Sequence, residues 1–301
     1  MKELVVVSGK GGTGKTSITA SLASIAKEKI FVDCDVDAAD LFLIMNPKKK
    51  ETHQFSSGSK ANIDLKKCVQ CGLCKNHCHF SAISSQFKID HIKCVGCGVC
   101  QFVCSSDAVS LEKNIGGEWY VSDTRFGELV HAKLGVAEDN SGKLVSIIRN
   151  KASEIAKEKN IDLIVVDGPP GIGCPVISSL TGCTDILVVV EPTVSGVHDM
   201  ERVIKLATNF KLRTMVCINK FDLNQDMVNE VDLYCEQKNI KIVGKIPYSS
   251  VFNRAQNIGK NIFEYISGIE ETSENTKDSQ ELARILFNMN EAIREQIFKE
   301  I

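Results

Sequence analysis

The sequence has no long apolar run, little net charge and, in its most cysteine-rich segment, neither arginine nor glutamate. No apolar run approaches the roughly 18 residues that a membrane-spanning helix needs, so the sequence predicts no such helix. Residues 1–3 lead straight into a short apolar run without a signal-like segment, so we expect a cytoplasmic protein with reduced thiols. A formal net charge of −2 on 301 residues gives no general attraction to nucleic acid or to an anionic membrane, and we expect neither partner.

Cysteine, by contrast, is abundant, and eight of the thirteen cysteines fall in two runs with the same C-x2-C-x2-C-x3-C spacing. The runs are Cys68, Cys71, Cys74, Cys78 and Cys94, Cys97, Cys100, Cys104. A repeated run of this kind is typical of a ferredoxin with two [4Fe–4S] clusters, in which the fourth cysteine of each run binds the other cluster. The spacing therefore predicts one cluster on Cys68, Cys71, Cys74 and Cys104, and a second on Cys94, Cys97, Cys100 and Cys78.

Zinc is the alternative for these cysteines, because Cys71-x2-Cys74 and Cys94-x2-Cys97 are spaced as in a zinc ribbon. That interpretation leaves four regularly placed cysteines without a role, so we favour the clusters. The five other cysteines are expected to be small buried hydrophobic residues, with Cys174 as the one to watch because it closely follows Asp167. They are Cys34, Cys174, Cys183, Cys217 and Cys235.

Short β-branched runs alternate with amphipathic helical patterns along most of the chain. The predicted strands are residues 4–7, 30–32, 161–166, 186–190, 214–218 and 241–246, and the helical stretches include 17–27, 143–159 and 198–209. Continuous apolar runs indicate strands buried on both faces, so the sequence predicts an α/β fold with a doubly wound, mostly parallel sheet. The pattern breaks between residues 54 and 111. We therefore predict one domain over residues 1–55 and 112–301 and an inserted ferredoxin-like domain over residues 56–111, entered through a small polar linker at 56–60.

The first predicted strand leads into Gly9-Lys10-Gly11-Gly12-Thr13-Gly14-Lys15-Thr16, which has the G-x-x-x-x-G-K-[ST] pattern of a phosphate-binding loop. Backbone N–H groups around the phosphates would come from Gly11, Gly12, Thr13, Gly14 and Ser17. Lys15 would neutralise phosphate charge, and Thr16 would bind Mg²⁺. A later apolar strand ends at Asp167 before a glycine-rich segment, and we expect Asp167 to hold the Mg²⁺ shell.

These motifs together resemble the MinD/ParA/Mrp superfamily of P-loop ATPases, in the branch with an inserted two-cluster ferredoxin domain that is often labelled cobyrinic acid a,c-diamide synthase-like. The resemblance rests on the K-G-G-x-G-K-T loop, the eight cysteines, and segments 140–145, 167–176 and 191–202. It implies binding of ATP and Mg²⁺, slow ATP hydrolysis, two [4Fe–4S] clusters, and a nucleotide-dependent homodimer or a heterodimer with a paralogous ATPase.

The resemblance also implies roles for single residues. Lys10 resembles the lysine that reaches across such a dimer to the partner's ATP, and Asp35 resembles the switch aspartate that orients the attacking water or the metal shell. Asn219 resembles the base-recognition position, with Pro247 as a backbone contact to the base and adenine favoured over guanine. Asp37 and Asp40 either share in the site or cap the next helix.

Charge and periodicity suggest partners for two further segments. Residues 56–110 carry six lysines and three aspartates, so their formal charge is +3 (six minus three). If these lysines lie around a cluster, they would steer an acidic redox partner to it. Residues 279–301 have apolar residues at helical spacing and no basic face, so we expect a helix that packs on the ATPase rather than on a membrane.

The favoured hypothesis is an ATP-binding, slowly hydrolysing protein in which the nucleotide state controls electron transfer through two [4Fe–4S] clusters. One alternative is an iron–sulfur cluster carrier or assembly ATPase, which complete four-cysteine sets disfavour because they would release a cluster reluctantly. The other is a positioning or scaffold ATPase whose ferredoxin-like domain is only a binding surface.

Overall fold

The computed structural model describes residues 1–135, 138, 141–268 and 275–299, which form two compact units. Unit 1 comprises Met1–Thr52, Tyr120–Ala132 and Ser141–Ile301, and unit 2 comprises His53–Trp119 and Lys133–Asn140. The predicted insert, residues 56–111, falls inside unit 2, and its exact limits as a domain stay a prediction. Asn140, the first residue of one motif that carries the family resemblance, and Ile301, the last residue of the predicted terminal helix, lie outside the described residues.

A nine-stranded sheet runs through the chain in the order β3-β4-β5-β2-β6-β1-β7-β8-β9. Its strands are β1 (Lys2–Ser8), β2 (Ile30–Asp33), β3 (Lys48–Ile63), β4 (Val109–Thr124), β5 (Gly127–Leu134), β6 (Leu163–Pro170), β7 (Asp185–Val190), β8 (Arg213–Asn219) and β9 (Lys241–Ile246). Strand β1 pairs in parallel with β6 and β7, β2 with β5 and β6, and β8 with β7 and β9. The predicted α/β fold with a mostly parallel sheet is confirmed.

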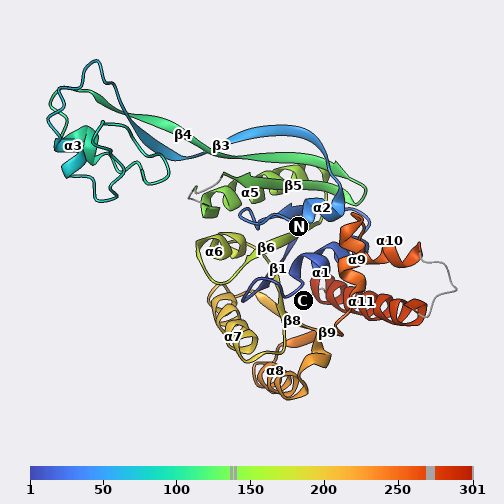
Figure 1. Ribbon diagram of the computed structural model, residues 1–301. Coiled ribbons are helices and arrows are strands. Elements are labelled where there is room, and N and C mark those ends of the chain that lie inside the picture. Colours follow the sequence, from blue (N-terminus) through green and yellow to red (C-terminus); the bar gives the residue numbers. More distant parts are fainter. Residues whose placement is uncertain (136–137, 139–140, 269–274, 300–301) are drawn as a thin grey trace. The chain divides into compact units, whose positions relative to one another are not determined.

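Helices cover both faces of the sheet in unit 1 (Figure 1). One face carries α1 (Lys15–Ser21), the 3-10 turn η1 (Leu22–Ser24), α2 (Leu41–Met45), α9 (Val251–Asn257), α10 (Ile262–Ser267) and α11 (Asn275–Phe298). The other carries α5 (Ser141–Lys159), α6 (Cys174–Leu180), α7 (Val194–Asn209) and α8 (Gln225–Gln237), and the short turn η2 (Phe221–Leu223) follows β8. Strand β1 is buried on both faces, because all of Leu4–Val7 are fully buried. Leu4 and Val6 belong to the core that also includes residues of α1 and α11.

The terminal helix α11 packs on the sheet, as the sequence predicts. Its residues Leu282, Leu286, Met289, Ile293 and Ile297 are all buried in the same core as β1 and α1. Within the described ranges, no helix combines the length and the apolar character needed to cross a membrane.

Three strands were not predicted, and two other predictions differ from the structure. Residues 56–60, expected to be a linker, lie inside β3, a strand of 16 residues that continues from unit 1 into unit 2. Most side chains of β3 and β4 are exposed or half-buried, so these strands need no continuous apolar run. The predicted helix over residues 17–27 is also shorter, because α1 ends at Ser21 and tightens into η1.

Unit 2 repeats one backbone pattern at the same 26-residue interval as its cysteines. Its short helices α3 (Leu73–Asn76) and α4 (Val99–Phe102) both begin after a glycine in the left-handed region, with φ of 80° at Gly72 and at Gly98. Asp64 N–H donates to the carbonyl of Ala108 at 2.8 Å, and Asp90 N–H donates to that of Ala82 at 2.7 Å. The sequence duplication is therefore a structural one.

Candidate functional site

The phosphate-binding loop joins β1 to α1 at the carboxyl end of the parallel sheet, where ligands bind in such folds. Gly14 precedes α1 with φ of 88°, and a Cβ there would collide with the side-chain amide of Asn219. A Cβ on Gly9 would collide with Asp199 of α7. Both glycines are thus required by close approach, and the loop is held between α7 and β8.

Lys15, Thr16 and Asp167 converge behind this loop. Lys15 Nζ lies 3.0 Å from Asp167 Oδ1, and the Thr16 hydroxyl donates to Asp167 Oδ2 at 2.7 Å. Thr19 donates to the same carboxylate at 3.1 Å. Burial alone would lower the pKa of Lys15, but the carboxylates of Asp167 and Asp35 raise it above its usual value. A hydroxyl beside a buried carboxylate is the oxygen donor set that Mg²⁺ uses in P-loop proteins, so these residues fit that ion.

Asp35 stands in the same group, and Asp33 joins it. Asp35 Oδ2 is 3.6 Å from Lys15 Nζ, and burial raises the pKa of its carboxyl. Asp33, the last residue of β2, is fully buried and opposite Asp167 in the β2–β6 register. Burial and the neighbouring Asp167 raise the pKa of Asp33 well above its usual value.

Sequence reasoning did not choose Asp33 as a site residue, although it stands in a cluster of four aspartates between residues 33 and 40. Its carboxylate accepts hydrogen bonds from the N–H groups of Asp35 and Leu41, each at 3.2 Å. Asp33 therefore shapes the loop that carries Asp35. Asp40 occupies the N-cap position of α2 but makes no capping side-chain bond, so the expected cap is provided by Asp33 instead.

Lys10 extends from the loop to the start of α7. Its Nζ lies 3.2 Å from Thr193 Oγ1 and 3.4 Å from Ser195 Oγ. The Thr193 hydroxyl also caps α7 by accepting the N–H of Gly196 at 3.0 Å. In this structure the ammonium of Lys10 is thus hydrogen-bonded within its own chain, by groups that hold no charge.

A cavity of about 260 Å³ opens beside the loop, where the base of a nucleotide is expected. It is lined by Gly12, Gly14, Ser17, Asn219, Lys220, Tyr248, Ser249, Phe252 and Asn253. Asn219 Nδ2 donates to the Thr13 carbonyl at 2.7 Å, which ties β8 to the loop. Thr13 Oγ1 is buried without a hydrogen-bond partner among the residues that the structure describes, and such a donor suits a bound anion. Pro247 is not one of the lining residues; its neighbour Tyr248 is, and sequence reasoning missed it.

The eight clustered cysteines line two separate cavities in unit 2. One cavity is bordered by Cys68, Cys71, Cys74 and Cys104, and the other by Cys78, Cys94, Cys97 and Cys100. The first three cysteines of each run thus share a cavity with the fourth cysteine of the other run. The zinc alternative would need Cys71 and Cys74 beside Cys94 and Cys97, and the two pairs lie in different cavities.

The electrostatics of the thiols follow the same division. Burial raises the pKa of Cys74, and Cys68, Cys104 and Cys71 add to that rise. Burial likewise raises the pKa of Cys100, with contributions from Cys94 and Cys97. The hydroxyl of Ser106 and nearby backbone N–H groups instead lower the pKa of Cys104.

Backbone groups also donate directly to sulfur in unit 2. Ala61 N–H donates to Cys94 Sγ at 3.5 Å, and Ala82 N–H donates to Cys78 Sγ at 3.4 Å. Hydrogen bonds of this kind stabilise thiolates. Within the described chain, no three His, Cys, Asp or Glu side chains are gathered as the ligands of a single metal ion would be.

Of the five other cysteines, four are buried as expected, and the expectation is wrong for Cys174. Cys34, Cys183, Cys217 and Cys235 are buried, and burial raises the pKa of Cys183 and Cys217 to about 12. Cys174 alone among the five is exposed, at the start of α6. The four buried thiols are unreactive core residues.

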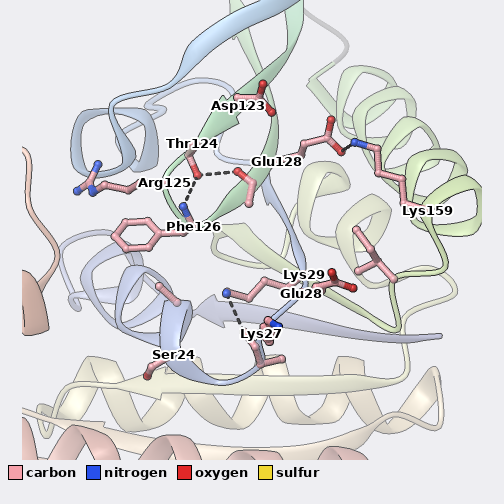
Figure 2. A pocket seen from close by; sticks show the side chains of 14 residues that line it. Ser24, Lys27, Glu28, Lys29, Asp123, Thr124, Arg125, Phe126, Glu128 and Lys159 are labelled. Carbon is pink, nitrogen blue, oxygen red and sulfur yellow. Dashed lines mark hydrogen bonds and ion pairs between the residues drawn. The ribbon is translucent and has the colours of Figure 1, made fainter.

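A larger cavity of about 790 Å³ in unit 1 lies away from every predicted site residue (Figure 2). In it Lys159 pairs with Glu128 at 2.7 Å, and Lys29 Nζ donates to the Ala26 carbonyl at 2.9 Å. We assign it no role in nucleotide binding.

The fold and the loop together define a P-loop nucleotide-binding protein of the α/β class. A family model, the CobQ/CobB/MinD/ParA nucleotide binding domain, matches residues 4–262, and the chain belongs to this family. Uncharacterized protein MJ0578 of Methanocaldococcus jannaschii is 36% identical over 228 residues, which cover 74% of this chain and 79% of that protein. The septum site-determining protein MinD of Bacillus subtilis is 24% identical over 208 residues, which cover 67% and 58%.

Solved structures agree at the level of the fold. The septum site-determining protein MinD complexed with Mg-ADP from Pyrococcus horikoshii superposes with a TM-score of 0.58 at 15% identity, covering 99% of this chain and 98% of that one. The family model confirms the predicted MinD/ParA relationship, and the chain is a nucleotide-binding protein of this family.

Proposed function

We propose that this protein is an ATP-driven iron–sulfur protein, in which unit 1 binds and slowly hydrolyses ATP and unit 2 holds two [4Fe–4S] clusters for electron transfer. The observation that supports it best is the division of eight cysteines between two cavities in the interleaved sets of a two-cluster ferredoxin. If these cysteines served only for packing, nothing would require the fourth cysteine of each run to line the cavity of the other run.

In unit 1, the polar groups around the phosphate-binding loop would act in phosphate chemistry. Lys15 and the N–H groups of the loop would bind the β- and γ-phosphates, while Thr16 and Asp167 would hold Mg²⁺, which neutralises the charge that develops on the phosphoryl group. Asp35, placed by Asp33, would orient the attacking water. Asn219 and Tyr248 would border the base, which we propose to be adenine.

In unit 2, the donor set fits two iron–sulfur clusters. Four thiols around each cavity would supply the ligands, and the clusters would supply one-electron redox chemistry. The N–H groups of Ala61 and Ala82 would stabilise the thiolates of Cys94 and Cys78.

Lys10 suggests that ATP closes a dimer. The ammonium is hydrogen-bonded to the uncharged hydroxyls of Thr193 and Ser195, and a γ-phosphate of a second subunit would replace these bonds. The second subunit would be a copy of this chain or a paralogous ATPase. Methanocaldococcus jannaschii has a second protein, MJ0579, that is 24% identical to this chain over 249 residues, so relatives of this chain occur as paralogues.

Anaerobic reconstitution with iron and sulfide tests the proposal. We expect about eight iron and eight sulfide ions per chain, and about four of each after Cys71→Ser or Cys97→Ser. Cys174→Ser is the matched control, because this cysteine is exposed but lies in neither cavity. Electron paramagnetic resonance of the reduced protein with and without ATP then tests the coupling: identical spectra, potentials and rates of partner reduction would refute nucleotide control.

A positioning or scaffold ATPase is the second candidate, and similarity to MinD favours it. The relatives named above include septum site-determining proteins of the same fold. A scaffold that uses unit 2 only as a binding surface should keep its nucleotide-dependent assembly after Cys71→Ser and Cys97→Ser. A cluster carrier, the third candidate, should transfer iron and sulfide to an apo-ferredoxin within minutes, which a permanent electron-transfer centre should not do.

A further inference from the structure

Lys60 differs from the other lysines of the cysteine-rich segment because its ammonium is held in place. Its Nζ donates to the carbonyl oxygens of His91 and Cys94, each at 2.9 Å. The other five are exposed, and they are Lys66, Lys67, Lys75, Lys88 and Lys93. Lys93 Nζ lies 3.7 Å from Asp90 Oδ2 in a surface ion pair. Exposed lysines are mobile and screened by salt, whereas Lys60 holds its charge at a fixed point of the fold.

The backbone of β3 explains why Lys60 lies there. Ser59 contacts the loop of the second cysteine run so closely that a Cβ on Gly96 would collide with its carbonyl. Two residues on, Ala61 N–H donates to Cys94 Sγ at 3.5 Å. Residues 59–61 thus lie along the Cys94 loop, with Lys60 bound to the carbonyl of one of the predicted cluster ligands.

The repeat in unit 2 shows that this charge is not duplicated. The 26-residue interval that relates Cys68 to Cys94 relates Lys60 to Gln86. Gln86 is neutral and exposed, and Phe87 beside it has φ of 57°, so the backbone there does not follow the extended course of β3. One cysteine set therefore has a bound cation where the other has an uncharged side chain.

We propose that Lys60 selectively raises the reduction potential of the cluster held by Cys78, Cys94, Cys97 and Cys100. The inference rests on the proposed function, since it concerns the clusters of unit 2. Reduction adds negative charge to a cluster, and a fixed positive charge beside a ligand stabilises that state. Lys60 thereby makes the two clusters unequal and favours the electron on the second set.

Anaerobic redox titration followed by electron paramagnetic resonance, on the reconstituted full chain, tests this role. In Lys60→Gln we expect one of the two potentials to fall by about 59 mV, a tenfold change in the one-electron equilibrium. The affected signal should be the one that Cys97→Ser alters, and not the one that Cys71→Ser alters. Lys60→Arg should restore the potential by keeping the charge. Lys75→Gln, which removes an exposed lysine next to Cys74, should change neither potential.

Failure of the proposed function and failure of the role of Lys60 would give different results. A wild-type chain that takes up no iron and sulfide would contradict the proposed function itself. With two clusters present, unchanged potentials in Lys60→Gln, or equal shifts of both, would refute the selective role of Lys60. Loss of about half the iron in Lys60→Gln and its retention in Lys60→Arg would also refute it, because Lys60 would then be needed to hold the loop rather than to set a potential.

Discussion

At the scale of single residues, the sequence predicted which residues the structure brings together at the candidate nucleotide site, but not the contacts that support them. The loop pattern predicts phosphate and Mg²⁺ roles for Lys15 and Thr16, and the apolar run that leads to Asp167 predicts a Mg²⁺ role for its carboxylate. Both predictions are possible because each motif is local in sequence. Asp33 was missed because its importance depends on the β2–β6 register, which sets it opposite Asp167. The sequence alone does not distinguish four aspartates within eight residues, because their difference in burial comes from the fold.

Mutation can distinguish the roles of Asp35 and Asp40 in that cluster. Asp35→Asn should lower phosphate release about 100-fold with little change in ATP affinity, because Asp35 is proposed to act on the attacking water rather than on bound nucleotide. Asp40→Asn is the matched control and should hydrolyse ATP as the wild type does, since Asp40 makes no capping bond. Equal loss in both variants would show that the loop, and not Asp35, determines the rate.

His131 predicts a pH dependence of stability. It is buried in β5, its Nε2 lies 2.9 Å from Ser122 Oγ, and burial, with help from Lys49, lowers its pKa to about 4. An unfolded histidine titrates near 6.5, so as the pH falls the unfolded chain takes up the proton first. Stability is therefore complete above about pH 6.5 and declines down to about pH 4, by about 3 kcal/mol.

His131→Gln should remove this decline. Urea unfolding followed by circular dichroism at pH 7, 5 and 4 measures it, and the difference between wild type and variant isolates His131 from other titrating groups. Parallel curves for the two proteins would contradict the assignment.

At the scale of elements, the strands buried on both faces were predicted and the exposed ones were not. All six predicted strands are present, because each has a continuous apolar run that only a covered parallel sheet explains. Strand β3 contains three consecutive lysines and the sequence Ser56-Ser57-Gly58-Ser59, which resembles a linker more than a strand. Its regularity comes from pairing with β4, and pairing partners far apart in sequence leave no local signal.

Helix α11 provides a test of packing at this scale. Leu286 is fully buried against the sheet, whereas its neighbour Phe287 is 55% exposed. Leu286→Ala should lower the free energy of unfolding by roughly 2–5 kcal/mol, and Phe287→Ala by less than about 1 kcal/mol. Chemical denaturation measures both. Similar small effects would mean that α11 contributes little to the core of unit 1.

At the scale of the whole molecule, the two units differ in how much core they have. Unit 1 has a large apolar core, while the buried core cluster of unit 2 consists of two cysteines and a few residues such as Ile63, Ile83 and Val109. Small cores rarely suffice without a bound group. If unit 2 holds clusters, its stability should depend on them and that of unit 1 should not.

Chelation of iron under anaerobic conditions checks this dependence. Trp119 is the single tryptophan, lies in unit 2 and stacks on His53 at 4.0 Å, so its fluorescence reports on unit 2. We expect its urea transition to move to lower urea after iron removal, while ATP affinity and the circular-dichroism transition of unit 1 stay unchanged. A fluorescence transition that does not respond to iron would show that unit 2 folds without clusters.

Strand β3 stands at one end of the sheet order, so among the described residues no further strand pairs with its outer edge. A bare strand edge invites a second chain to add to it, which leads to aggregation. Lys48, Lys49 and Lys50 begin this edge with exposed side chains, and Lys50 also forms ion pairs with Asp123 and Glu128. A second copy approaching edge to edge would bring the same charges with it. The lysines that made β3 hard to recognise in the sequence are thus charges of the kind that disfavours edge-to-edge pairing.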